Sequence, residues 1–328
     1  METKIFAGNI SDMQAAATII KNGGLVALPT ETVYGLGANA LDANAVKKIF
    51  AAKNRPMDNP LIVHLADASD LMRVAANIPP KAEKLINAFW PGALTIILPS
   101  NGVVPPETTG GLCSVAVRVP LNRVAREVIR MAGVPVAAPS ANSSGKPSPT
   151  LAIHVKEDLD GKIDAIIDGG AATLGLESTV IDLTGEPCLL RPGMITKEMI
   201  EDVIGAVNIG GIIDDTESPK SPGMKYRHYA PKAPVFLFEP TIEAMHEINK
   251  KANYKTGIFV SKQNAEIFRN GRIIVSGDLN DPKTIAANLF KALREFDFIG
   301  VNEIYAEIIS DTGEGVAIMN RLQKAAMK

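Results

Sequence analysis

Apolar residues recur along the first two hundred positions with two different spacings. Apolar side chains at helical spacing over 12–22, preceded by Ser11 with Gln14 as a capping box, predict a helix. Short apolar runs such as 25–28 and 61–65 are typical of buried strands. Further helices are predicted at 42–53, 80–89, 121–131 and 150–159, and further strands at 94–98, 115–119, 134–138, 165–167, 179–183 and 188–190.

The order of these elements indicates the fold class. Helices separate many of the predicted strands, whereas the strands between 165 and 190 follow one another with only turns between them. This mixture predicts an α/β fold in which helices surround a mixed sheet, and not a pure series of βαβ units.

A change of composition divides the chain. Residues 208–233 are rich in Gly and Pro and poor in apolar side chains, which marks a linker. Beyond it, regular strand–helix alternation predicts a small doubly wound domain. We therefore expect a first domain over 1–207, a linker over 208–233 and a second domain over 234–328. The strands expected in the second domain are 235–238, 257–260, 272–275 and 303–309, and the helices are 241–252, 282–296 and 315–326.

Charge and composition exclude some classes of protein. The formal net charge of −2 argues against a broad polyanion-binding surface. The amino terminus lacks the pattern of a signal peptide, and no apolar stretch approaches the ~20 residues of a membrane span. We therefore expect a cytoplasmic protein without a membrane partner. Cys113 and Cys188 lie far apart and form no CxxC pair, which argues against a disulfide framework or a thiolate zinc site.

Three short motifs do not hold up when their surroundings are considered. The GxGxxA match at 35–40 is separated from the preceding strand and lacks the acidic residue that dinucleotide sites place ~20 residues later. The stretch 141–145 resembles a nucleophile elbow, but Pro147 and Pro149 block the helix that must follow an elbow. The same Pro147 stands where a P-loop requires Ser or Thr.

Five polar, Gly/Pro-rich segments do look like parts of a site, because each lies beside a predicted buried strand. Loops at strand ends are where α/β proteins place their ligands. The segments are 29–37, 53–60 running into 61–64, 117–120, 138–142 with 146–150, and 175–179 with 191–193.

Charged side chains in these segments leave two interpretations open. Lys53 and Arg55 would suit a polyphosphate if they leave an extended chain on one face, but basic residues at a helix end also favour the helix dipole. Arg118 interrupts an apolar strand and needs a carboxylate, either from a substrate or from the protein. His64 ends an apolar strand in the same way, where a satisfied core histidine is the common arrangement.

The same segments also contain pairs of neutral polar residues. Hydroxyl and amide side chains of this kind orient ligands in pockets, although each pair by itself also fits turn and cap chemistry. The pairs are Thr30 with Thr32, Ser140 with Asn142, and Ser178 with Thr179.

Taken together, the segments resemble the YrdC-like family, in the two-domain form of the L-threonylcarbamoyladenylate synthases. The linker stretch 221–231 and Asn320-Arg321 resemble features of that two-domain form. The other matching stretches are 28–37, 53–56, 59–64, 90–92, 117–118, 138–142, 177–179 and 190–193.

The resemblance implies a YrdC-like twisted, largely parallel sheet with helices around a wide basic cavity, and a smaller Rossmann-like second domain. It implies a nucleotidyltransferase that condenses L-threonine with bicarbonate and joins the carbamate to the α-phosphate of ATP, releasing pyrophosphate. Mg²⁺ is then expected on the phosphates, with few dedicated protein ligands. A downstream transferase complex would pass the threonylcarbamoyl group to the adenosine beside the tRNA anticodon, so contact with tRNA is possible but indirect.

The resemblance also implies roles for individual residues. We further expect the linker stretch 221–231 to fold over the pocket as a lid. The residues implied for L-threonine are Thr32, His64, Arg118, the Ala138 backbone and Ser178, and those implied for ATP are Lys53, Arg55, Asn59, Ser114, Ser140, Asn142, Ser148, Arg191 and Tyr229, with Lys53 and Arg55 as the catalytic cations.

Two other functions compete with this one. A YrdC-like domain with a basic concavity would bind tRNA without chemistry, although the weakly acidic net charge counts against it. Carbamoyl transfer, as in hydrogenase maturation factors that share the domain, is the other alternative. Those factors carry acylphosphatase and zinc-finger segments, and two cysteines are too few for such fingers.

Overall fold

The computed structural model describes residues 2–210 and 228–327, which fall into two compact units. In the described part, no helix is both long enough and apolar enough to cross a membrane. Most of the expected linker, and with it most of the expected lid, lies outside the described residues. The first unit comprises Met1–Ser144, Pro149–Thr173 and Glu177–Lys225, and the second comprises Gly145–Ser148, Leu174–Leu176 and Tyr226–Lys328.

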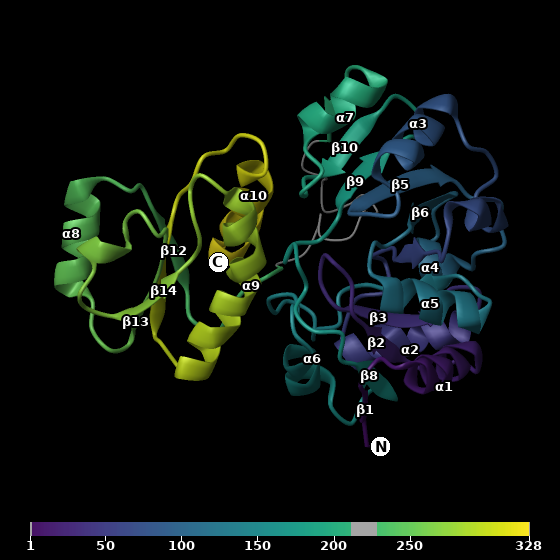
Figure 1. The fold of residues 1–328 in the computed structure, drawn as a ribbon, viewed down its shortest axis with the longest axis horizontal. Helices are drawn as coiled ribbons and strands as arrows, with labels where there is room; N and C mark the ends of the chain where they lie inside the picture. The colour runs from purple at the N-terminus through teal and green to yellow at the C-terminus, as the bar shows by residue number, and fades with distance from the viewer. Residues whose placement is uncertain (1, 211–227, 328) are drawn as a thin grey trace. The chain divides into compact units, whose positions relative to one another are not determined.

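An eleven-stranded mixed sheet forms the first unit (Figure 1). Among the described strands, five neighbouring pairs are parallel and five are antiparallel. The predicted mixed sheet is therefore confirmed, and the largely parallel sheet that the resemblance implied is wrong. In spatial order the strands are β1 (Lys4–Phe6), β8 (Ala165–Ile167), β2 (Val26–Leu28), β3 (Gly35–Asn39), β7 (Val136–Ala137), β4 (Ile62–His64), β6 (Ser114–Arg118), β5 (Leu94–Pro99), β9 (Thr179–Asp182), β10 (Cys188–Arg191) and β11 (Asn208–Ile209).

Helices pack on both faces of this sheet. On one face, apolar residues of α2, α3, α6 and α7 join the strands in the main core. On the other face, α1 and α5 cover the strands β1, β8, β2 and β7 with a second cluster. The helical elements of the unit are α1 (Ile10–Lys21), η1 (Ala68–Arg73), α2 (Ala43–Lys53), α3 (Pro80–Phe89), α4 (Pro106–Thr109), α5 (Arg123–Ala132), α6 (Ala152–Leu159) and α7 (Lys197–Ile204).

The start of α1 differs from its prediction. Asn9 is the N-cap, and its side-chain oxygen accepts a hydrogen bond from the Asp12 amide at 3.0 Å. Ser11 lies within the first turn of the helix, so the predicted capping box is wrong. The asparagine two positions earlier is an equally good cap, because its short side chain reaches the same free amides.

Strand β3 was missed, because a run of glycine and small residues reads as a loop. Its register with β2 pairs Gly35 with Leu28, and its other edge pairs with β7. A Cβ atom at Gly37 would lie 3.0 Å from the Val136 side chain. Glycine is therefore needed here for close packing between strands. Helix α7 and the short strands β1 and β11 were also missed.

The second unit is a four-stranded parallel sheet in the spatial order β12-β15-β13-β14, with α8 on one side and α9 and α10 on the other (Figure 1). This arrangement agrees with the expected small doubly wound domain. The elements are β12 (Val235–Phe238), α8 (Ile242–Lys251), β13 (Thr256–Val260), η2 (Ala265–Ile267), β14 (Arg272–Val275), α9 (Pro282–Ile299), β15 (Glu303–Glu307) and α10 (Gly315–Ala326).

Candidate active site

Alternation along the central strands separates the core from the candidate site. Successive side chains of a strand point to opposite faces of the sheet. In β6, Val115 and Val117 enter the main core, so Arg118 emerges on the other face. In β4, Val63 enters the core and His64 leaves on the opposite side. The two polar residues therefore share one face of the sheet.

A small apolar cluster forms the floor beside these polar residues. Its described members all come from strands, and they are separate from the main core. The parallel register of β4 and β6 pairs His64 directly with Arg118 at the edge of this floor. The floor consists of Ile62, Ile97, Ala116 and Val180, with Leu190 packed against it.

Arg118 is the buried cation of this face, with 3% of its surface exposed. Its Nη2 donates to Glu31 Oε1 at 2.5 Å, its Nη1 donates to Thr32 Oγ1 at 2.8 Å, and its Nε donates to the Gly92 carbonyl at 3.0 Å. Of the two partners that the sequence left open, the protein carboxylate is therefore the one that Arg118 contacts here.

Glu31 links this arginine to the start of α5. Its Oε2 accepts hydrogen bonds from the amides of Leu121 at 3.0 Å and Asn122 at 3.3 Å. Burial by itself raises the pKa of Glu31, but the charge and hydrogen bond of Arg118, together with the Leu121 amide, outweigh it and hold the pKa below the ordinary value. The carboxylate is therefore ionised at neutral pH.

His64 is a neutral imidazole at this site. Burial first, and the nearby Arg118 charge second, lower the pKa of His64 to about 3. Its Nδ1 lies 3.2 Å from the Ile62 carbonyl, which can only accept, so Nδ1 carries the proton. The Nε2 atom is left as a hydrogen-bond acceptor.

Lys53 connects the end of α2 to the expected Ser140–Asn142 segment. Only 1% of the lysine is exposed. Its Nζ donates to the Ser140 carbonyl, to the Asn142 carbonyl at 2.6 Å and to Asn142 Oδ1 at 3.5 Å. The helix ends at this lysine, and Asn54 follows in the left-handed conformation with φ 52°. The lysine charge is thus fixed by loop carbonyls, which position it rigidly.

A third polar group joins the other side of the floor. Ser178 Oγ lies 2.7 Å from Thr95 Oγ1 and accepts from Arg191 Nη2 at 3.2 Å. Arg191 Nε also donates to the Ser178 carbonyl at 3.0 Å. Thr95, a polar residue inside the apolar β5 strand, was missed by the sequence analysis. Its isolated hydroxyl was the signal that would have drawn attention to it.

The remaining expected residues of the first unit are Ser114, Arg55, Asn59 and Ala138. Ser114 begins β6 whereas Arg118 ends it, so about 13 Å of strand separates the two. Arg55 and Asn59 are buried, and no described residue is within hydrogen-bonding reach of Asn59 Oδ1. The Ala138 amide donates to the Ile62 carbonyl at 3.0 Å, which leaves its carbonyl as the group for a ligand.

Ser148 and Tyr229 belong to the second unit. Tyr229 has φ 67° and is 5% exposed. Its ring lies 5.1 Å from the ring of Phe290 and 5.6 Å from the Arg321 guanidinium carbon. The reach of Tyr229 to a nucleotide remains a prediction, as does the lid, since 221–227 lie outside the described residues.

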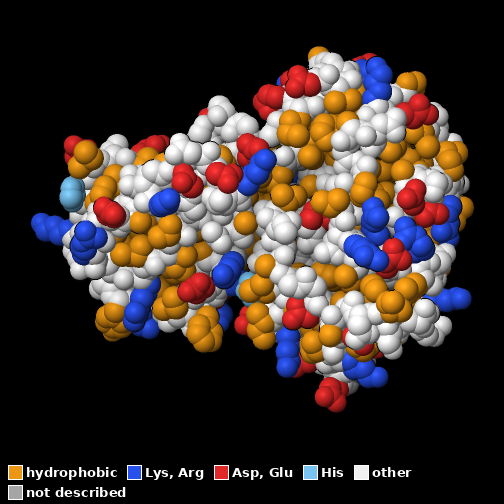
Figure 2. Space-filling view, viewed as in Figure 1, with side chains coloured by type: hydrophobic (Ala, Val, Ile, Leu, Met, Phe, Trp, Pro, Cys, Tyr) orange, Lys and Arg blue, Asp and Glu red, His pale blue; other side chains and the backbone are white. Residues whose placement is uncertain are grey.

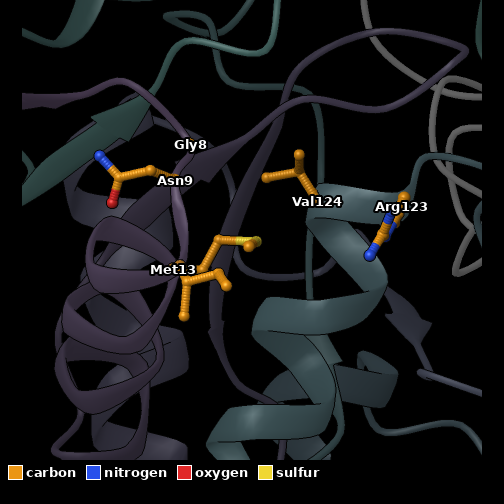
Figure 3. A pocket seen from close by; sticks show the side chains of 6 residues that line it. Gly8, Asn9, Met13, Arg123 and Val124 are labelled. Atoms are coloured by element: carbon orange, nitrogen blue, oxygen red, sulfur yellow. The ribbon is translucent and has the colours of Figure 1, made fainter.

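A shallow pocket of about 270 Å³ lies beside α1 and α5 in the first unit. Figure 3 shows Met13 from α1 and Val124 from α5 on the two neighbouring helices, with Arg123 in the first turn of α5. None of the expected site residues lines this pocket. Across 2–210 and 228–327, no group of three or more His, Cys, Asp or Glu side chains could hold a metal ion.

Comparisons with known proteins agree with this architecture. A family model described as "Telomere recombination" matches residues 18–193, and a model of the C-terminal domain of threonylcarbamoyl-AMP synthase matches residues 195–327. The threonylcarbamoyl-AMP synthase of Bacillus subtilis is 48% identical over 324 residues, covering 97% of this chain and 94% of its own. That of Pyrococcus abyssi is 50% identical over 324 residues, covering 96% of this chain and 94% of its own.

Solved structures extend the likeness to three dimensions. Pyrococcus abyssi Sua5 complexed with L-threonine matches with a TM-score of 0.92 and 48% identity, covering 99% of this chain and 98% of that one. A variant of the same protein, in which an adjacent histidine and tyrosine are replaced by alanine, matches with the same score and identity over 99% and 96% of the two chains.

The fold and the polar sheet face thus define an α/β enzyme of the YrdC-like class. The second unit and the two family models narrow the class further. The chain belongs to the two-domain threonylcarbamoyl-AMP synthase family.

Removal of the Glu31 carboxylate tests the buried ion pair. Breaking a buried pair from one side leaves a charge without compensation, so Glu31→Ala should lower the free energy of unfolding by about 3–5 kcal/mol. Denaturant titration measures this. The matched control is Glu127→Ala, which breaks an exposed pair with Arg130 and should change stability by ~1 kcal/mol or less. Equal losses of unfolding free energy in the two variants would contradict the assignment of Glu31 and Arg118 as a buried ion pair.

The pKa of His64 predicts how this residue responds to pH. Its folded pKa near 3 lies below the unfolded value of 6.5, so the unfolded chain binds a proton first as pH falls. The contribution of His64 to stability is complete above pH 6.5 and is lost progressively toward pH 3. Histidine-selective NMR should therefore show one imidazole, absent in His64→Gln, that stays neutral from pH 8 to 5. Titration of that signal near 6.5 would refute the burial argument.

Proposed function

We propose that this chain makes L-threonylcarbamoyladenylate from L-threonine, bicarbonate and ATP. The observation that supports this proposal most strongly is the environment of Arg118. Its buried guanidinium is held by Glu31 and Thr32 beside the neutral imidazole of His64. Membership of the family supports the activity, and the threonine complex of the P. abyssi relative supports an amino-acid site.

Threonine would bind over the apolar floor. The Arg118 guanidinium would hold the threonine carboxylate, with Thr32 Oγ1 beside it, because planar guanidinium groups recognise carboxylates bidentately. His64 Nε2, an acceptor in the neutral tautomer, would take a hydrogen bond from the threonine hydroxyl. The Ser178 hydroxyl and the Ala138 carbonyl would orient the amine. A site that accepts from a hydroxyl discriminates against amino acids that lack one.

ATP would meet the basic residues at the end of α2. Lys53 and Arg55 would stabilise charge that develops on the triphosphate, because fixed cations in a site poor in water act strongly. Lys53 already lies against the Ser140–Asn142 loop, which would bring Ser140 and Asn142 to the nucleotide. The other residues proposed for ATP are Asn59, Ser114, Ser148, Arg191 and Tyr229.

The reaction balances without a covalent enzyme intermediate. The threonine amine and bicarbonate form a carbamate with loss of water. A carbamate oxygen then bonds to the α-phosphorus of ATP, the bond to the bridging oxygen breaks, and pyrophosphate leaves. Mg²⁺ would enter with the phosphates and offset their charge. Positioning of the two reactants would supply much of the rate, up to about 7–11 kcal/mol in favourable cases.

The product would pass to a transferase complex that modifies the adenosine beside the tRNA anticodon. Direct RNA binding has weaker support, since Figure 2 shows basic and acidic side chains interspersed on the face in view, and the net charge is −2. Salt-dependent RNA affinity without pyrophosphate release would favour the RNA-binding alternative.

Pyrophosphate release tests the proposed activity. The full chain with ATP, threonine and bicarbonate should release pyrophosphate only when all three are present. Arg118→Ala and Lys53→Ala should each lower the rate at least ~10²-fold, as expected for a key electrostatic donor. The surface substitution Lys47→Ala on α2 should have no effect, because that side chain is half exposed. Release that does not depend on threonine would refute the proposal.

Tyr229 tests the expected contact with ATP. Tyr229→Ala should raise the KM for ATP and leave the KM for threonine unchanged, because of the two substrates the aromatic ring is proposed to contact the nucleotide alone. Tyr229→Phe keeps the ring and should restore the wild-type KM. Circular dichroism of both variants checks folding, because the ring packs on Phe290. An unchanged KM for ATP in the folded alanine variant would remove the residue from the site.

A further inference from the structure

The second unit contains a cavity of about 550 Å³ at the carboxyl edge of its parallel sheet. The residues after β12 and β15 and the first turns of α9 and α10 line it. Open parallel sheets bind ligands at this edge, and small-molecule pockets span roughly 300–1,000 Å³. None of the residues proposed for threonine or ATP lines the cavity, so it is a separate site.

Glu307 lies in the wall of this cavity at the end of β15 and is 3% exposed. The carboxylate accepts hydrogen bonds from the Ser261 amide at 2.6 Å, from Ser261 Oγ at 3.1 Å and from Asn264 Nδ2 at 2.7 Å. These are all donors, as an ionised carboxylate requires. Within the described ranges, no lysine, arginine or histidine forms an ion pair with it. A buried charge normally has a counterion, so a cationic ligand would complete the group.

The cavity is unsuited to an anion. Glu314 adds a second carboxylate, paired only at the surface with Lys283 at 3.8 Å, and no basic side chain of the described chain lines the cavity. The helix starts offer few free amides. Pro282 begins α9 without an N–H, and the Gly315 amide at the start of α10 donates to the Thr312 carbonyl. A phosphate would therefore meet negative charge with no basic side chain and few free backbone amides to offset it.

The rest of the wall is largely apolar. Leu279, Pro282 and Ile285 lie on the α9 side, and Ile308 and Ile309 lie on the β15 side. Such surfaces favour the burial of a hydrocarbon or aromatic body.

We propose that this cavity binds a small organic cation, an amine attached to an apolar body. The ammonium group lies against Glu307, where charge-assisted hydrogen bonds are strong. Ser310 and Thr312 also line the cavity, and their hydroxyl oxygens, which lie 2.8 Å apart, can each accept a further ammonium proton. The apolar body lies between the α9 and β15 walls. This site is independent of the proposed synthase reaction.

Three probes that share one body test the charge preference. Phenethylamine, 2-phenylethanol and 3-phenylpropionate are titrated into the full chain labelled at isoleucine methyl groups. The amine should shift the signals of Ile285, Ile308 and Ile309 and should bind about tenfold or more tightly than the alcohol. The carboxylate should not shift them. Equal or tighter binding of the carboxylate overturns the proposal, and so does the absence of shifts with the amine.

Substitutions in the cavity wall test whether the amine binds in this cavity. Glu307→Gln should abolish the preference for the amine over the alcohol. Because Glu307 is buried, its substitution can also affect folding, so a second variant is made at the rim of the cavity. Leu279 is 37% exposed there, and Leu279→Trp should fill the cavity and weaken amine binding about tenfold or more. The control is Phe298→Trp, which is 89% exposed and about 24 Å along α9 from Pro282, and it should bind normally.

Wild-type binding by Leu279→Trp would overturn the assignment to this cavity. The titrations contain neither ATP nor threonine, and pyrophosphate release is measured separately on the same proteins. Failure of amine binding with normal release, or the reverse, therefore distinguishes this proposal from the proposed function.

Discussion

A permanent charge buried on one face of the sheet constrains the candidate active site. The Arg118 guanidinium cannot lose its proton, so a buried position requires nearby acceptors. Glu31, Thr32 and the Gly92 carbonyl accept from three of its N–H groups, and they come from segments far apart in the chain. Glu31 also holds the start of α5, which makes the arginine part of the framework.

The charge of Arg118 also influences the protonation state of His64. His64 is paired with Arg118 across two parallel strands, and burial together with that positive charge keeps the imidazole neutral. Lys53 is positioned by a similar principle, because its ammonium group is surrounded by carbonyls of the 140–142 loop. Both arrangements are set by the protein itself, so the proposed substrates would require little reorganisation of these groups on binding.

Much of the fold was predictable from local pattern. Short apolar runs and helical periodicity located β4, β6, α2 and α9, because burial of one face imposes a regular spacing on any sequence. Strand β3 was not predicted, because the glycines that allow its close packing carry no hydrophobic signal. The role of Glu31 as the partner of Arg118 was not predicted either, because a single acidic residue in a polar loop has no distinctive sequence pattern.

The sequence alone determined that the chain has two α/β parts with a Gly/Pro-rich segment between them, and which polar segments flank buried strands. It determined these things because hydrophobic spacing and turn residues are local properties of the chain. Only the tertiary structure decided that Arg118 pairs with Glu31 and that Thr95 meets Ser178. Strand register and the folding of distant loops bring such partners together, and no local pattern encodes those distances.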